Sequence, residues 1–344
     1  MKNDIKKVVV SCNNCGSSDT EFVTTGVEHE YDNTTRDEFT VVKCKRCNLH
    51  YLNPRPDVSE LGTIYPSEYY AYHLQTKNVE IENQDSLLYR ARKFVYLTRL
   101  EKALSHCQPA DQVNVLDIGC ADGRALNWYR KIESKKVHTF GVDFDPIAVQ
   151  RARDAGHTVY QGLFEEADMP MNFFDMAVAT HVIEHVADSK AFARRAYDVI
   201  KPGGILLLET PNIDSLDAQI FRKRHWGGYH FPRHWIFYSA ESISQLAKEL
   251  GFTIIEIRYH PAPAFWNWSF HSMLGARAEF KQLADFLFPP ADFQENNLKN
   301  LCAVSLFTLF DIMQKALTGK TSNMSVLLQK PCDPTLAPHK CPGN

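Results

Sequence analysis

Two pairs of cysteines near the start of the chain have the spacing of metal ligands. Cys12 and Cys15 form one C-x2-C pair, Cys44 and Cys47 form a second, and 28 residues lie between the pairs. Each pair can direct two thiolates to one ion, which gives the tetrahedral four-thiolate shell of a structural zinc site. The spacing therefore predicts that these four residues bind Zn2+. Unrelated buried thiols are the alternative, and a redox pair is disfavoured because no strand–helix–strand pattern surrounds either pair.

Histidines form a second group of residues that could do chemistry. His181-Val-Ile-Glu-His185 has the H-x-x-E-H order of inverted zinc peptidases, which requires both histidines on one helix face. The stretch from Arg224 to Ser239 holds three more histidines among aromatic residues. Imidazole exchanges protons near neutral pH, so these histidines are candidate general bases. The candidate catalytic residues are His234, which we place first, and His181, His185 and His230. For His181 and His185 the alternative is a purely structural role, and for His234 it is a core histidine that holds the loop.

A small-residue turn and an acidic residue indicate a third site. Asp117-Ile-Gly-Cys-Ala-Asp-Gly123 follows an apolar run, and its glycines allow a ligand to approach the backbone closely. Asp143 ends the next apolar run, 24 residues after Gly119, where its carboxylate can accept hydrogen bonds from a ribose diol. The turn is not a G-x-G-x-x-G dinucleotide motif, and it lacks the lysine of a phosphate-binding P-loop.

The elements that must position these residues alternate between strands and helices. Strands are expected at 113–118, 137–143, 158–161, 176–180 and 205–210, and helices at 86–107, 124–131, 146–155 and 190–200. Continuous apolar strands that alternate with helices predict an α/β fold with a mostly parallel sheet and helices on both faces. Ligands of such sheets bind at the carboxyl ends of the strands, which is where the glycine turn, Asp143 and His181 lie.

The ordered motifs carry a resemblance to a known family. Val115-Leu-Asp-Ile-Gly-Cys-Ala-Asp-Gly123, Gly-Val-Asp143, Phe174-Asp175, His181-Val-Ile-Glu-His185 and Ile200-Lys-Pro-Gly-Gly204 together resemble a class I S-adenosylmethionine-dependent methyltransferase over residues 85–260. The cysteine pairs with Asn53-Pro-Arg-Pro56 and Tyr69-Tyr70 are similar to the zinc-ribbon members of that superfamily. The resemblance implies a Rossmann-like domain that binds S-adenosyl-L-methionine, preceded by a small β zinc ribbon.

The resemblance also implies a role for individual residues. The methionine part of the cofactor would lie over Asp117, Gly119 and Ala121, its ribose on Asp143, and its adenine against Phe144, Gly162 and Leu163, with Thr180 and His181 facing the sulfonium. His234 resembles the base histidine of zinc-ribbon sugar C-methyltransferases, but Phe231-Pro-Arg-His234 departs from their Tyr-His-Glu-His pattern. O-, N- and C-methylation of a small polar metabolite, such as a sugar or glycoconjugate, therefore all remain open.

We expect five segments along the chain. They are a zinc ribbon at 1–56, a tyrosine-rich linker or lid at 57–84, the methyltransferase domain at 85–260, a C-terminal lid or packing extension at 261–330, and a flexible tail at 331–344. The apolar segments 264–270 and 301–317 are expected to pack on the core, with a dimer surface and a membrane surface as alternatives. No segment is expected to span a membrane, because no uncharged apolar run reaches the necessary ~18 residues.

Composition excludes some classes of partner. The chain has 344 residues, of which 44% are hydrophobic, and 38 Lys+Arg against 41 Asp+Glu give a net charge of −3. This balance argues against a protein that coats nucleic acid in general, because such binding needs a strong basic excess. No signal sequence is recognised after Met1, so a cytoplasmic location is expected. An RNA methyltransferase that grips RNA with its ribbon is the alternative function, although residues 1–56 hold eight basic and eight acidic residues. The sequence assigns no oligomeric state.

Overall fold

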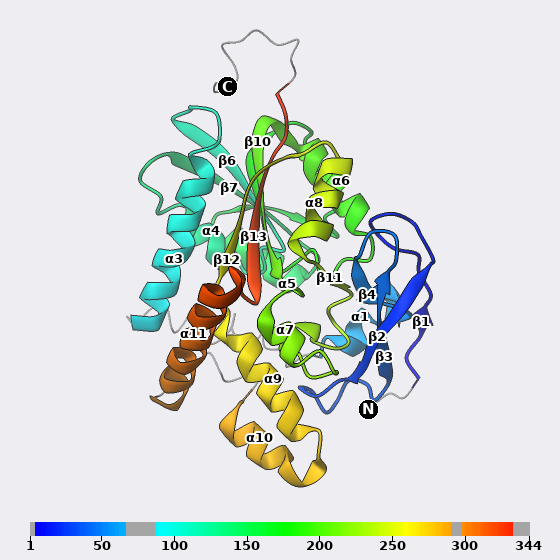
Figure 1. Cartoon of the computed structure of the whole chain (residues 1–344). Helices are drawn as coiled ribbons and strands as arrows, with labels where there is room; N and C mark the ends of the chain where they lie inside the picture. Colours follow the sequence, from blue (N-terminus) through cyan, green and yellow to red (C-terminus); the bar gives the residue numbers. More distant parts are fainter. Residues whose placement is uncertain (1–3, 67–86, 290–297, 333–344) are drawn as a thin grey trace.

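Strands and helices alternate from Gln112 onward and build a seven-stranded sheet (Figure 1). The computed structural model describes residues 4–66, 87–289 and 298–332. The strands, in spatial order, are β12 (Thr253–His260), β13 (Asn323–Gln329), β10 (Ile200–Pro211), β9 (Phe174–Thr180), β6 (Gln112–Ile118), β7 (Lys136–Asp143) and β8 (Thr158–Gln161). Only β13 runs antiparallel to its neighbours, so the carboxyl ends of the other six strands share one edge.

Helices cover both faces of this sheet, as the alternation predicts. The helices α3 (Leu87–Leu104), α4 (Arg124–Tyr129) and α5 (Pro146–Asp154) contribute Leu104, Leu126 and Val149 to one apolar cluster. On the other face, α6 (Ser189–Val199) and α8 (Ala240–Glu249) contribute Phe192 and Leu246 to a second cluster. Most observed bounds lie within about two residues of the expected ones. The helix expected at 86–107 ends three residues early, at Leu104. The largest difference is in β10, which begins at Ile200 instead of Ile205 because its first residue already pairs with Phe174.

Side-chain caps start the helices that follow the strands. Asp145 accepts hydrogen bonds from the N–H groups of Ile147 and Ala148, and Pro146 occupies the first turn of α5. Asp188 caps α6 in the same way, and Ser239 forms a capping box with Ser242 at the start of α8. Such caps satisfy N–H groups that the helix itself leaves unbonded.

The N-terminal ribbon does not form its sheet alone. A hairpin of β2 (Thr20–Val27) and β3 (Glu38–Cys44), with its tip at 31–36 as predicted, pairs with β4 (His50–Leu52). The fourth strand of this sheet is β11 (Ile236–Phe237), which comes from the later part of the segment 85–260. Nearby lie β1 (Lys7–Val8), which pairs with β5 (Arg55–Pro56), and the short helices η1 (Val58–Glu60) and α1 (Leu61–Ile64). The ribbon expected at 1–56 is therefore joined to residues near 236 by a shared sheet.

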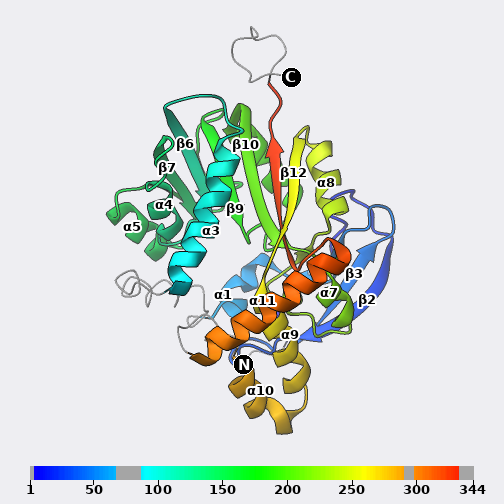
Figure 2. The same ribbon diagram turned by 60° about the vertical axis from the view of Figure 1, so that its left-hand side comes forward.

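The expected boundary between the domain at 85–260 and the extension at 261–330 is not where the main sheet ends. We expected residues 261–330 to lie outside the domain, but β13 is an inner strand of the main sheet, between β10 and β12. The other elements of the second half gather beyond the carboxyl ends of the strands (Figures 1 and 2). They are α7 (Leu216–Ile220), η2 (Gly227–Tyr229), α9 (Pro263–Gly275), η3 (Ala278–Phe280), α10 (Lys281–Leu287) and α11 (Leu298–Thr318).

The helix α11 differs from the expectation that no segment is able to span a membrane. By length and composition it could cross one, although Lys299, Asp311 and Lys315 interrupt its apolar run. Residues 67–86, which include Tyr69, Tyr70 and Tyr72 of the predicted lid, and residues 333–344 of the predicted tail lie outside the described residues.

Candidate active site

The turn after β6 presents backbone rather than side chains. Gly119 and Gly123 have φ angles of 72° and 82°, and Ala121 adopts 49°, a conformation that side-chain-bearing residues rarely take. A Cβ added to Gly141 of the neighbouring strand β7 would lie 2.4 Å from the Cys120 sulfur, so the turn packs tightly on that strand. The backbone at the carboxyl end of β6 is thereby held open to a ligand.

Asp143 fixes this turn from the end of β7. Its two carboxylate oxygens accept hydrogen bonds from the N–H groups of Ala121 and Asp145, each at 2.9 Å. Burial raises the pKa of Asp143. Since a carboxylate has about four lone-pair positions, these two bonds leave room for the hydroxyls of a ligand.

Two large apolar side chains stand exposed beside Asp143. Phe144 is 52% exposed and Leu163, in the loop after β8, is 45% exposed. The two loops are adjacent because the N–H of Gly162 donates to the carbonyl of Asp143. Gly162 has a φ of 135°, and a Cβ there would meet nothing within 4 Å. An apolar slot with open space beside it suits a flat aromatic ring such as a purine.

Asp117 lies beneath the turn in a buried network of phenols. The hydroxyl of Tyr129 donates to the Asp117 carboxylate at 3.1 Å and lies 2.7 Å from the hydroxyl of Tyr96 on α3. Burial raises the pKa of Asp117 to about 7.

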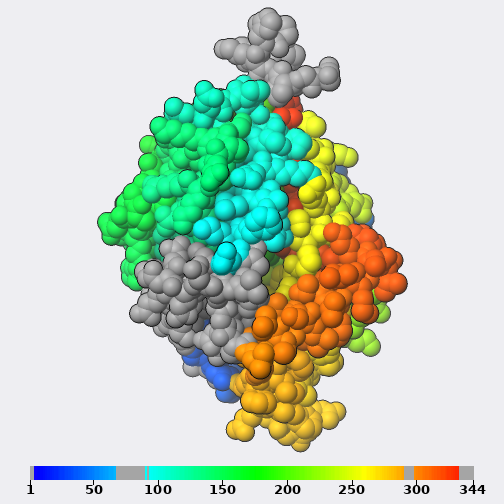
Figure 3. All heavy atoms as spheres, turned by 90° about the vertical axis from the view of Figure 1, so that its left-hand side faces the viewer, coloured from blue at the N-terminus to red at the C-terminus, as the bar shows by residue number. Residues whose placement is uncertain are grey.

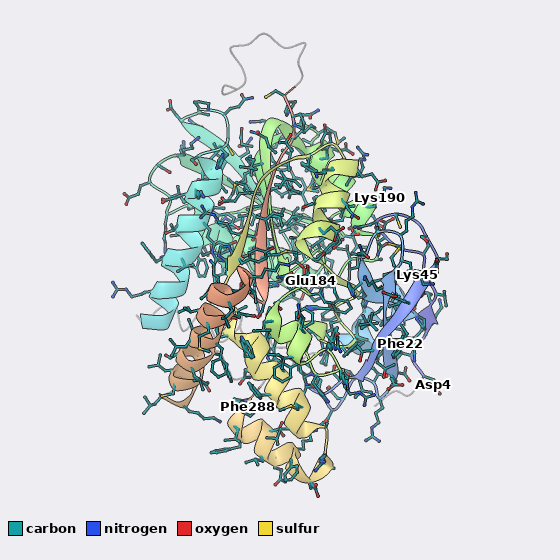
Figure 4. All side chains as sticks on the ribbon, in the orientation of Figure 1. Asp4, Phe22, Lys45, Glu184, Lys190 and Phe288 are labelled. Atoms are coloured by element: carbon teal, nitrogen blue, oxygen red, sulfur yellow. The ribbon has the colours of Figure 1, made fainter. Side chains whose placement is uncertain are left out.

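The residues after β9 form a turn and not a helix, so the H-x-x-E-H motif does not place its histidines on one helix face. His181 Nδ1 instead lies 3.0 Å from Oε1 of Glu184, whose Oε2 accepts a hydrogen bond from Thr210 at 3.0 Å. Burial alone would raise the pKa of Glu184, but the bond to His181 and the nearby imidazoles lower it to about 2. The zinc-peptidase alternative is therefore not supported, because it needs both histidines on one helix. Glu184 is instead a buried carboxylate around which the histidines of this region gather (Figure 4).

His185 and His234 approach one another beside this carboxylate. Their ring centroids are 4.6 Å apart, and Nδ1 of each donates to a backbone carbonyl, that of Arg233 at 3.1 Å and that of Gly228 at 2.8 Å. The Tyr65 hydroxyl lies 2.8 Å from His185 Nδ1. With Nδ1 protonated, the lone pair of each neutral ring is on Nε2. Burial lowers the pKa of both histidines, so both are neutral near pH 7.

His230 joins the cluster to the ribbon. Its ring centroid is 4.9 Å from that of His234, Nδ1 is 2.7 Å from Glu30 Oε1, and Nε2 accepts a hydrogen bond from Arg233. Arg233 is fully buried and donates to both oxygens of Glu28, at 2.5 and 3.0 Å. Glu28 and Glu30 belong to the loop that follows β2, so the ribbon supplies the anions that hold this part of the site.

The four predicted metal ligands meet in the ribbon. Sulfur atoms lie 3.3 Å apart for Cys12 and Cys47 and 3.5 Å apart for Cys15 and Cys44, and all four lie within 4.8 Å of one another. Zinc–sulfur bonds of ~2.3 Å in a tetrahedron require sulfur atoms about 3.8 Å apart, so the residues fit a Zn2+ ion. Glu184, His185 and His234 also have ligand atoms within 4.8 Å of one another. Since His181 and Thr210 hold Glu184 beside two imidazoles that donate their Nδ1–H groups to backbone carbonyls, we interpret these three as an acid–base cluster.

The structure thus separates the predicted residues into three neighbourhoods. Asp117, Gly119, Ala121, Asp143, Phe144, Gly162, Leu163 and Thr180 lie at the ends of β6 to β9 or in the loops that follow. His181, His185 and His234 lie around Glu184, His230 lies beside His234, and the cysteines lie in the ribbon. Sequence reasoning missed Tyr65, Glu184 and Arg233 as members of the site. The tyrosine-rich run and the glutamate within H-x-x-E-H were the available signals.

Comparison with known proteins agrees with this geometry. Residues 84–257 match the family described as "Methyltransferase domain". The mitochondrial ubiquinone biosynthesis O-methyltransferase of Mus musculus is 26% identical over 206 residues, which cover 54% of this chain and 55% of that protein. The ubiquinone biosynthesis O-methyltransferase of Azorhizobium caulinodans is 35% identical over 111 residues, covering 30% of this chain and 43% of that protein.

Among solved structures, an S-adenosylmethionine-dependent methyltransferase from Archaeoglobus fulgidus matches with 17% identity and a TM-score of 0.44, covering 73% of this chain and 98% of that one. The chain spans about half the length of the first curated relatives it matches. The family match extends over half of the chain and includes the glycine turn, Asp143 and the histidine turn after β9. The chain therefore belongs to the methyltransferase domain family and carries a class I S-adenosylmethionine-dependent methyltransferase domain.

Proposed function

We propose that the protein transfers the methyl group of S-adenosylmethionine to a hydroxyl oxygen of a small polar acceptor, with His234 as general base. The two curated relatives described above are named O-methyltransferases, which favours oxygen over nitrogen or carbon as the acceptor atom. The zinc-ribbon resemblance favours a sugar or glycoconjugate as the acceptor class.

The cofactor fits the edge formed by β6, β7 and β8. Asp143 would accept hydrogen bonds from the ribose hydroxyls, and Phe144 and Leu163 would lie against the adenine. Asp117 and the backbone from Gly119 to Ala121 would face the methionine part, with Thr180 near the sulfonium. When bound, the cofactor supplies a methyl group already activated by positive sulfur, so the protein must mainly align the acceptor and remove its proton.

The proposed base is supported chiefly by the pairing of two neutral imidazoles beside a buried carboxylate. As the acceptor oxygen forms its bond to the methyl carbon, its proton would pass to Nε2 of His234. The charge of Glu184 would stabilise the imidazolium that results, because unlike charges in a buried site attract strongly. His230 has both ring nitrogens engaged, so we assign it the positioning of Arg233 and of the loop that carries His234.

The test combines an acceptor screen with one substitution. Nucleotide-sugars, phenols and RNA are offered with labelled S-adenosylmethionine, and a sugar or phenolic hydroxyl is expected to be methylated. His234→Gln should lower kcat by about 10²–10⁴-fold with cofactor affinity unchanged. His138→Gln is the matched control, because His138 is an exposed residue of β7 that contacts Gln112. Methylation of RNA alone, or full activity of His234→Gln, would refute the proposal.

A further inference from the structure

The helix α11 turns several polar side chains inward and exposes a row of large apolar ones. Three of its polar residues, Asn300, Asp311 and Gln314, are 2%, 0% and 1% exposed. Seven large apolar side chains of the same helix are between 40% and 78% exposed, a set we call the outer face: Leu298, Leu301, Leu306, Leu309, Ile312, Met313 and Leu317. A helix on the surface of a soluble domain normally turns its apolar stripe inward and its polar side outward. Something other than water is therefore expected to cover the outer face.

Specific hydrogen bonds hold α11 in this orientation. Asp311 accepts them from the indole N–H of Trp266 at 3.1 Å and from the backbone N–H of Ala262 at 2.7 Å. Gln314 donates to Asp311 at 2.6 Å and to Ser322 at 3.1 Å. Rotation of the helix to hide its leucines would leave a buried network without partners, which is costly. The exposure of the outer face is a fixed property of the fold.

The outer face is wide and uncharged, and lysines stand at its borders. At 100° per residue its seven side chains fall within an arc of about 160°, together with Cys302, Ser305 and Ala316. Lys299 and Lys315 lie at or just beyond the two sides of that arc. The apolar surface continues onto α10, where Phe286 is 66% exposed and carries the Lys299 ammonium 4.5 Å from its ring centre. Figure 3 shows α11 (orange) on the surface beside α9 and α10 (gold).

The chemistry of the outer face fits a lipid surface better than a protein. Protein interfaces are enriched in Tyr, Trp, Phe, Met and Arg, and of these types the arc contains only Met313, whereas leucine, its commonest residue, is under-represented among the residues that dominate binding energy. Leucine, isoleucine and methionine bordered by lysines are typical of a helix that lies in the headgroup boundary of an anionic bilayer. Since the other side of α11 packs on α9, the helix can lie along a membrane without crossing it.

We propose that α11 docks the protein on the surface of an anionic lipid bilayer. The outer face would enter the boundary between headgroups and acyl chains, with Lys299 and Lys315 near the lipid phosphates. The helix α9 lies between this surface and the histidine cluster, because Trp266 bonds to Asp311 while the Trp268 ring lies 5.9 Å from that of His230. The candidate active site would then lie one helix away from the bilayer.

The test is flotation of the full chain with vesicles of phosphatidylcholine alone and of phosphatidylcholine with phosphatidylglycerol. The wild type should float with the anionic vesicles, and Leu309→Glu/Ile312→Glu should weaken that association more than tenfold, by roughly the loss of two buried aliphatic side chains. The matched control is Val9→Glu/Phe22→Glu, which changes two side chains of the ribbon that are 81% and 69% exposed. Unchanged calorimetric binding of S-adenosylmethionine would show that each variant is folded.

Two outcomes would overturn the proposal. One is equal flotation of the wild type and Leu309→Glu/Ile312→Glu. The other is a wild type that stays out of both vesicle types. If light scattering then showed a wild-type dimer that the same substitutions convert to a monomer, the outer face would be an interface between two copies of this chain.

Discussion

At the scale of single residues, the candidate active site contains carboxylates whose pKa values the fold has shifted. Asp117 and Asp143 both have raised pKa values because burial disfavours their charged forms, whereas Glu184 has a lowered one because burial is outweighed by the hydrogen bond and charges of neighbouring histidines. The family match alone would not reveal these differences. They arise from which side chains the turns bring together.

Because burial raises the pKa of Asp117 to about 7, we expect cofactor affinity to depend on pH. Below that value the side chain is neutral, and above it the carboxylate attracts the positively charged methionine part of the cofactor. Affinity measured by calorimetry should therefore rise several-fold between about pH 6 and about pH 8, because each pKa unit corresponds to roughly 1.4 kcal/mol. Asp117→Asn should remove the rise, while Asp154→Asn, at the end of α5, should retain it. An unchanged pH profile in Asp117→Asn would contradict this assignment.

Several site residues could be predicted because their signals are local. The glycine turn, Asp143 and His181 each directly follow an apolar strand, and the carboxyl ends of parallel strands meet at one edge. The four metal ligands could likewise be predicted from the spacing of the two C-x2-C pairs alone. Tyr65 and Glu184 could not be ranked, because their importance depends on contacts with His185, 120 residues beyond Tyr65, and with Thr210.

At the scale of elements, a buried ion pair connects the ribbon to the histidine loop. Arg233 binds Glu28 through two hydrogen bonds, donates to the carbonyl of Ile64, and lies near Glu30. No local pattern predicted these contacts, since about 200 residues separate Arg233 from the two glutamates. The same reason explains why β11 in the ribbon sheet and β13 inside the main sheet were not predicted. Strand pairing across such separations is not encoded by periodicity.

Removal of Arg233 should destabilise the protein strongly. Arg233→Met leaves Glu28 and Glu30 buried with their charges uncompensated, which typically costs about 3–5 kcal/mol of unfolding free energy. The triple variant Arg233→Met/Glu28→Gln/Glu30→Gln should recover part of this loss, because it removes the unpaired charges. Urea unfolding followed by circular dichroism measures the unfolding free energy of both variants. Equal stability of wild type and Arg233→Met would mean that the ion pair does not hold the ribbon.

At the scale of the whole molecule, the ribbon and the methyltransferase domain act as one unit. The strand β11 begins two residues after His234 and pairs with β4, which lies three residues after Cys47. A metal bound by the cysteines would therefore stabilise the strand that carries the proposed base into position.

Loss of the metal should affect catalysis more than cofactor binding. Cys44→Ser should abolish zinc binding, measured by elemental analysis, and should lower the melting temperature by several degrees, since structural zinc contributes directly to folding. Methyl transfer should fall with the metal, while affinity for S-adenosylmethionine persists because β6, β7 and β8 belong to a different sheet from the ribbon strands. Cys107→Ser, a buried free cysteine outside the ribbon, is the control. Full zinc content in Cys44→Ser would contradict the four-cysteine site.

The most direct test of the account is calorimetric titration of the full chain with S-adenosylmethionine and S-adenosylhomocysteine. Both should bind to the wild type. Asp143→Ala should weaken binding at least about tenfold, because a carboxylate that accepts hydrogen bonds from a ligand typically contributes 1.5 kcal/mol or more. Asp143→Asn, which keeps the shape of the side chain, should show a similar loss. A folded, zinc-loaded wild type that binds neither compound, or an Asp143→Ala variant that binds as the wild type does, would contradict the proposed cofactor site.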